Sequence, residues 1–130
     1  TPFFIGCLVA VSRYFLGTPG MRQTALVIYM QARDPSLPLI LLDSVGQSYR
    51  MGSGDIVVLK QVDMAIRAGE TCALLGASGS GKSTLLNILG LLDQPSSGRF
   101  YFNGRNMAAT GAAERANLRN REIGFVFQSF

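Results

Sequence analysis

The chain of 130 residues has about the length of one ordinary domain, with room for one modest hydrophobic core. It has 12 Lys and Arg against eight Asp and Glu, a net charge of +4. The basic residues are scattered and no aromatic–basic platform accompanies them, so we expect no nucleic-acid partner. The absence of histidine excludes His-based acid–base chemistry and metal ligation. Cys7 and Cys72 are too far apart in sequence to form a metal or redox motif, and Cys72 is expected to be a small buried hydrophobe.

Residues 1–36 are interpreted as a poorly defined apolar leader. The apolar run 3–16 is shorter than the roughly 20 residues that span a bilayer, and Arg13 interrupts it. The chain begins at Thr1 rather than Met and ends directly after an apolar run, so we expect a piece of a longer protein. Asp-Pro and Leu-Pro pairs close the leader, and an ordered domain is expected over 37–130.

The first half of the expected domain has strand-like patterns. Residues 39–45 are predicted to form a strand, and the Gly, Ser and Asp content of 50–55 predicts a loop. The second half of 56–66 alternates between apolar and polar residues, which predicts a strand with one covered face. Residues 71–75 form a nearly continuous apolar run, as expected for a central parallel strand covered on both faces.

The second half alternates helix and strand patterns. We expect a buried helix over 85–92, a loop over 93–98, a strand over 100–102 that enters a hairpin at Asn103-Gly104, a short polar helix over 112–122 and a strand over 123–127. This order predicts an α/β fold: a P-loop NTPase core preceded by a small antiparallel β subdomain, and incomplete.

The stretch GASGSGKST, residues 76–84, carries the chemistry. Gly76, Gly81, Lys82 and Ser83 fit the pattern G-x-x-x-x-G-K-[ST], between a predicted buried strand and a predicted buried helix. Glycines let backbone N–H groups approach phosphate oxygens, and the start of the helix adds unpaired N–H groups and a positive dipole end.

The expected roles follow from this pattern. Lys82 would reach the β- and γ-phosphates and the Ser83 hydroxyl would bind Mg²⁺. The phosphate-binding residues are expected to be Gly76, Ala77, Ser78, Gly79, Ser80, Gly81, Lys82, Ser83 and Thr84.

Two other interpretations of the loop fail, and so does a metal-binding interpretation of a strand that precedes it. A flexible linker would not stand between a buried strand and a buried helix. A dinucleotide fingerprint needs Gly or Ala where this chain has Thr84. Residues 39–43, LILLD, imitate a metal-binding strand, but they precede the loop and Ser44 follows Asp43, so we expect no metal role for Asp43.

Residues 38–130 resemble the nucleotide-binding domain of ABC transporters. The resemblance is carried by GETCALLGASGSGKSTLLNILGLLDQPSSGRFYFNG and REIGFVFQSF, which are similar to the branch that serves lipoprotein release and macrolide export. The resemblance implies that ATP and Mg²⁺ bind here. It also implies that Tyr49 stacks on adenine and that Gln128 reaches Mg²⁺ and the attacking water, so that Lys82 and Gln128 are the catalytic residues of the segment.

The resemblance further implies an ATPase that powers transport. Its expected partners are a membrane-spanning permease and a second ATP-binding domain, head to tail, at the cytoplasmic face of the inner membrane. The signature sequence, the Walker B Asp-Glu pair and the switch histidine are absent from these residues, so we expect the 130 residues alone to be inactive. The alternatives are a P-loop GTPase or kinase fragment, and a non-enzymatic truncated product that binds nucleotide weakly.

Overall fold

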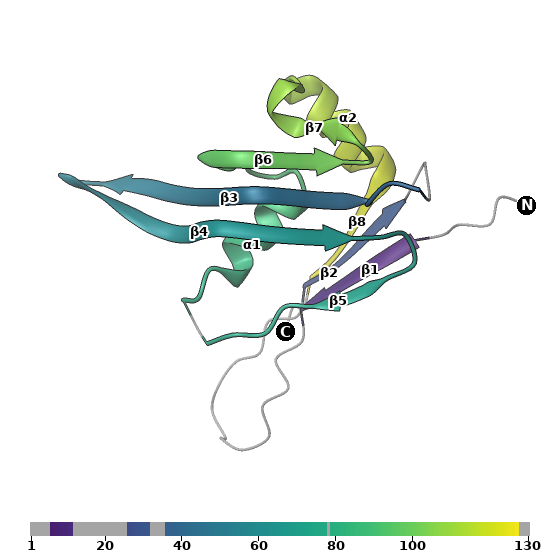
Figure 1. The fold of residues 1–130 in the computed structure, drawn as a ribbon, viewed down its shortest axis with the longest axis horizontal. Coiled ribbons are helices and arrows are strands. Elements are labelled where there is room, and N and C mark those ends of the chain that lie inside the picture. The colour runs from purple at the N-terminus through teal and green to yellow at the C-terminus, as the bar shows by residue number, and fades with distance from the viewer. Residues whose placement is uncertain (1–5, 12–25, 32–35, 78, 128–130) are drawn as a thin grey trace, which may run out of the picture.

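The structure is a computed structural model that describes residues 6–11, 26–31, 36–77 and 79–127, arranged as two sheets and two α-helices (Figure 1). The elements are β1 (Gly6–Val11), β2 (Leu26–Gln31), β3 (Ile40–Met51), β4 (Gly54–Ile66), β5 (Thr71–Ala73), α1 (Lys82–Leu89), β6 (Ser97–Phe102), β7 (Arg105–Asn106), a short 3₁₀ turn η1 (Met107–Ala109), α2 (Ala112–Glu122) and β8 (Ile123–Phe127). One sheet has the order β4-β3-β6-β7 and the other β5-β1-β2-β8.

The first sheet is antiparallel and is built from two hairpins joined through β3 and β6. The loop predicted over 50–55 lies between two strands as expected but is shorter: β3 ends at Met51 and β4 begins at Gly54, with a tight turn at Gly52, whose φ is 61°. Arg50 and Asp55 face each other in register and form an ion pair at 3.6 Å. The predicted hairpin at Asn103 and Gly104 is confirmed, since both residues have positive φ, 51° and 75°.

The second sheet sets the direction of the strand that leads to the glycine-rich loop. β5 pairs in parallel with β1, and β2 pairs antiparallel with both β1 and β8. β5 and β8 therefore run in the same direction, and their carboxyl ends lie at the same edge of the sheet. The two intervening strands separate them by about 14 Å, three strand spacings.

The expectation that 71–75 is a central strand covered on both faces is wrong. β5 is only Thr71–Ala73 and lies at the end of its sheet, paired along one edge with β1. Cys72 is half-buried against the core, whereas Thr71 and Ala73 are exposed and Leu75 is 73% exposed. Within the described residues, the core covers only the face of β5 on which Cys72 lies.

β1 and β2 come from the segment interpreted as a leader, for which the sequence predicts no regular elements. Most of the apolar run 3–16 lies outside the described residues, and the division of the chain at residue 36 stays a prediction. Neither α1 nor α2 is long enough to cross a bilayer, so the described part of the chain holds no candidate membrane-spanning helix.

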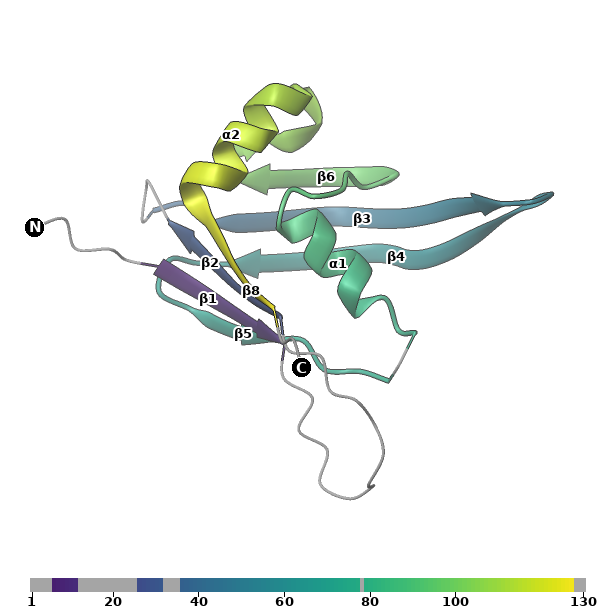
Figure 2. The ribbon, with the colours of Figure 1, turned by 180° about the vertical axis from the view of Figure 1, so that it is seen from behind.

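α1 joins the two sheets through its buried residues. It lies behind β3 and β4 in Figure 1 and in front of them in Figure 2. The predicted buried helix is confirmed in its main part: Leu85, Leu86, Ile88 and Leu89 are buried in one core with residues of β3, β4, β6 and β8. The helix ends at Gly90, where an added Cβ would lie 2.5 Å from the ring of Phe125 in β8. The predicted polar helix over 112–122 and strand over 123–127 have the expected bounds.

Ile88 tests this core, because it is fully buried in the last turn of α1. We expect Ile88→Ala to lower the free energy of unfolding by about 2–5 kcal/mol, through lost burial and the cavity left behind. Leu92→Ala is the control, since Leu92 is 50% exposed just after the helix, and its cost should stay below about 1 kcal/mol. Urea unfolding of the two variants measures both values, and equal losses would contradict the packing of α1.

Candidate functional site

The glycine-rich loop connects the end of β5 to the start of α1 and packs against β4. Gly79 and Gly81 have φ of 78° and 88°, in the left-handed region that favours glycine. At Gly81, space is also limited, because a Cβ there would lie 2.9 Å from the Leu59 side chain and 3.1 Å from the Val58 carbonyl oxygen. The loop therefore meets the antiparallel sheet with backbone alone at Gly81.

The Lys82 ammonium folds back over the same loop. Its Nζ donates hydrogen bonds to the Ala77 carbonyl oxygen at 2.5 Å and to Ser80 Oγ at 2.9 Å. Ser80 Oγ in turn lies 2.7 Å from the place where Gly76 would carry a Cβ. The loop thus surrounds the Lys82 ammonium, and the absence of a side chain at Gly76 leaves room for the Ser80 hydroxyl next to it.

The N-terminus of α1 has unusual polar chemistry for a helix start. Its N-cap is Gly81, no side chain caps it, and no acidic residue lies in its first turn. The first-turn N–H groups and the positive end of the helix dipole are therefore not matched by a side-chain acceptor. Ser83 is exposed in this turn and offers a hydroxyl oxygen, the ligand type that Mg²⁺ prefers. This donor set fits a phosphate group with its magnesium ion.

The structure brings most of the predicted phosphate site together. Gly76, Ala77, Gly79, Ser80 and Gly81 lie in the loop, and Lys82, Ser83 and Thr84 form the first turn of α1. Ser78 and Gln128 lie outside the described residues. β8 ends at Phe127, at the same sheet edge as the carboxyl end of β5 from which the loop departs.

Tyr49 lies near the far end of β3, where its contacts were not foreseen. The residue is 37% exposed, and its hydroxyl donates a hydrogen bond to Asp93 Oδ2 at 3.1 Å. Gln47, which is buried, donates to the same oxygen at 3.4 Å. Sequence reasoning treated Asp93 only as the start of a loop. The two partners are 44 residues apart, and no local pattern signals such a pair.

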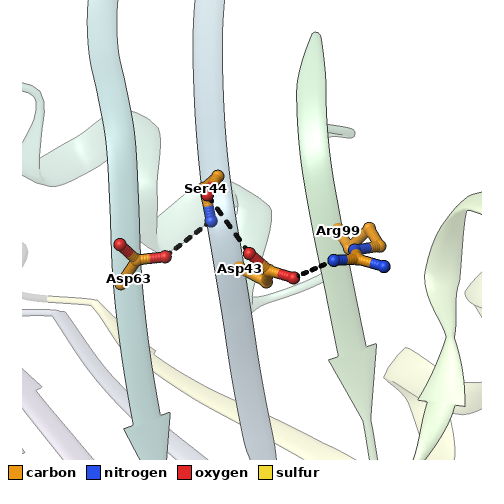
Figure 3. Close-up of polar contacts among 4 residues, drawn as sticks. All are labelled: Asp43, Ser44, Asp63 and Arg99. Atoms are coloured by element: carbon orange, nitrogen blue, oxygen red, sulfur yellow. Dashed lines mark hydrogen bonds and ion pairs between the residues drawn. The ribbon is translucent and has the colours of Figure 1, made fainter.

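Asp43 has a structural role in the antiparallel sheet. Figure 3 shows its carboxylate between Arg99 of β6 and the hydroxyl of Ser44, while Asp63 of β4 accepts a hydrogen bond from the Ser44 N–H at 2.7 Å. These contacts hold a bulge in β3 at which Ser44 has a φ of 53°. The hydrogen bond and the charge of Asp43 raise the pKa of the Arg99 guanidinium.

The packing of the loop is tested by comparing two glycines. Gly79→Ala and Gly81→Ala both place a Cβ at positive φ, which costs about 1–2 kcal/mol. Only Gly81→Ala also pushes that Cβ against Val58 and Leu59, adding about 1–3 kcal/mol of overpacking. Urea unfolding should therefore rank Gly81→Ala as the more destabilised variant. A loss at Gly79 equal to or larger than that at Gly81 would contradict the contact between loop and β4.

Known proteins resemble this chain over the segment that contains the glycine-rich loop. Residues 59–130, more than half of the chain, match the family model described as ABC transporter. The chain is 53% identical over 94 residues to a lipoprotein-releasing system ATP-binding protein, LolD, of Nitratidesulfovibrio vulgaris, a match that covers 72% of this chain and 40% of the relative. It is also 53% identical over 93 residues to a macrolide export ATP-binding/permease protein, MacB 1/2, of Paracoccus denitrificans, covering 72% of this chain and 14% of the relative.

Solved structures show the same likeness. The dimeric post-hydrolysis structure of the ATP-binding cassette MJ0796 bound to ADP and Pi has a TM-score of 0.60 and 39% identity, covering 62% of this chain and 34% of that one. The chain thus spans about two fifths or less of the length of these relatives. This confirms the predicted fold class, which is an incomplete P-loop core with a small antiparallel subdomain. The chain belongs to the ABC transporter family, as part of its ATP-binding cassette.

Proposed function

We propose that this chain is the nucleotide-binding part of an ABC transporter ATPase, and that it binds the phosphates of Mg-ATP at the loop before α1. The observation that carries the proposal is the Lys82 ammonium held inside a glycine loop, next to an uncapped helix start. A positive charge, free N–H groups and a hydroxyl converge there, and a triphosphate satisfies all three.

The loop residues bind ATP by exchanging partners. Lys82 Nζ leaves the Ala77 carbonyl oxygen and Ser80 Oγ for the β- and γ-phosphate oxygens, which are stronger acceptors because they are charged. The backbone N–H groups of the loop and the first turn of α1 hold the remaining phosphate oxygens. Ser83 supplies an oxygen ligand to the magnesium ion, which neutralises charge on the phosphates when bound. Tyr49 supplies the ring on which the adenine stacks.

Hydrolysis and transport belong to the whole protein. We propose that Gln128 orients the attacking water and contacts the magnesium ion. The general base and the signature sequence would come from residues outside this segment. The proposed partners are a membrane-spanning permease and a second cassette, placing the protein peripherally at the cytoplasmic face of the inner membrane. The names of LolD and MacB support this proposal, because both describe ATP-binding components of export or release systems.

Lys82→Ala tests the phosphate site. A charge-assisted contact contributes about 1.5–3 kcal/mol, so the variant should bind Mg-ATP roughly ten- to a hundredfold more weakly. Lys60→Ala is the matched control, because Lys60 is the other lysine of the chain and lies exposed on β4. Calorimetric titration measures both affinities. Equal affinity of Lys82→Ala and the unaltered chain, with the fold intact, would rule out this loop as the phosphate site.

A second test separates binding from hydrolysis. Of the described carboxylates, Glu70 is nearest to the loop in sequence, but it precedes β5 and therefore lies at the opposite end of that strand. General acid–base assistance is worth about 10²–10⁴-fold in rate. We therefore expect these 130 residues to bind Mg-ATP without turnover above background, and the full-length protein to release phosphate steadily. Lys82-dependent turnover by the 130 residues alone would show that they already contain the base.

A further inference from the structure

Asp93 ties the end of α1 to the aromatic side chain of Tyr49. The Asp93 N–H donates to the Asn87 carbonyl oxygen at 3.1 Å, and the Leu92 N–H donates to the same oxygen at 2.8 Å. Asp93 Oδ1 accepts from the Gln94 N–H at 2.8 Å, which fixes the carboxylate relative to the backbone. Its other oxygen, Oδ2, accepts from Tyr49.

A second set of contacts holds the loop that follows α1, residues 93–96, against β3. The Ser96 N–H and hydroxyl both donate to Gln47 Oε1, at 2.8 and 3.1 Å, and the Ser48 N–H donates to Ser96 Oγ at 3.1 Å. Gln47 is only 5% exposed, whereas Ser96 lies at the surface, so Gln47 is the buried member of this network. Asp93 is therefore held on both sides, by α1 and by β3.

The surroundings of Tyr49 give its ring little other support. Ile56, its partner on β4, is 50% exposed, and Met51, two residues along β3, is 64% exposed. A tyrosine on such a hairpin end would sample several side-chain rotamers, and a ligand that stacks on it would have to immobilise it. The hydrogen bond to Asp93 restricts that freedom before any ligand arrives.

We propose that Asp93 is a positioning residue that holds the Tyr49 ring ready for the base of the nucleotide. The inference rests on the proposed function, because it requires the phosphates to bind at the start of α1. α1 then connects both halves of the site: its N-terminus faces the phosphates, and the loop after its C-terminus orients the base platform through Asp93. The carboxylate itself does not touch the nucleotide.

The experiment measures the affinities of Mg-ATP and of Mg-tripolyphosphate, which has no base. Tyr49→Phe keeps the ring and removes only the hydroxyl. Asp93→Ala removes the acceptor of that hydroxyl, together with the acceptor of Gln47 and of the Gln94 N–H. Each variant should lower the affinity for Mg-ATP about three- to tenfold, because one more side chain must then be immobilised on binding. Tripolyphosphate affinity should change less than twofold. The double variant should be no weaker than either single variant, and Asp93→Asn, which keeps an acceptor oxygen, should recover most of the affinity.

The controls separate this proposal from the one on which it rests. Tyr101→Phe removes a hydroxyl from another tyrosine of the same sheet and should leave both affinities unchanged. Unchanged Mg-ATP affinity in Tyr49→Phe and Asp93→Ala, equal losses for tripolyphosphate, or additive effects in the double variant would each overturn the role of Asp93. Tyr49→Ala without effect on the ratio of the two affinities would overturn the base platform itself. An unaltered chain that binds neither ligand would overturn both proposals.

Discussion

The packing of α1 between the two sheets is the constraint on which the rest of the structure depends. Leu85, Leu86, Ile88 and Leu89 bury one helix against strands that are far apart in sequence. Once that helix is fixed, the loop before it has a fixed end point, pressed against β4 at Gly81. The free N–H groups of the helix start are then held toward the loop by the hydrophobic core, with no side chain of their own to cap them.

The same helix gives the site two ends with different chemistry. Lys82, in the first turn, contacts the loop through hydrogen bonds that a phosphate can replace. Asp93, just beyond the last turn, contacts Tyr49 on a strand of the other subdomain. Under the proposed function, phosphate binding and base binding are therefore connected through one helix, and a change in the position of α1 would alter both together.

Local patterns predicted much of this fold, and long-range contacts account for what they missed. The turn at Asn103 and Gly104, the helix 112–122 and the glycine loop could be predicted because their signals lie within a few adjacent residues. The loop expected over 50–55 is reduced to a tight turn, because pairing between β3 and β4 extends to Met51 and Gly54 despite the Gly and Ser content of the segment. The edge position of β5 depends on which strands pair beside it, and an apolar run does not encode that choice.

Amide NMR spectra recorded during titration with Mg-ATP test the central claim most directly. If the loop and the start of α1 bind the phosphates, the largest shifts should appear at the N–H groups of residues 79–84, which would gain charged phosphate oxygens as neighbours. Smaller shifts should follow at Tyr49, on which we propose that the base stacks. Saturable ATP binding that leaves the amides of 79–84 unshifted would contradict the account.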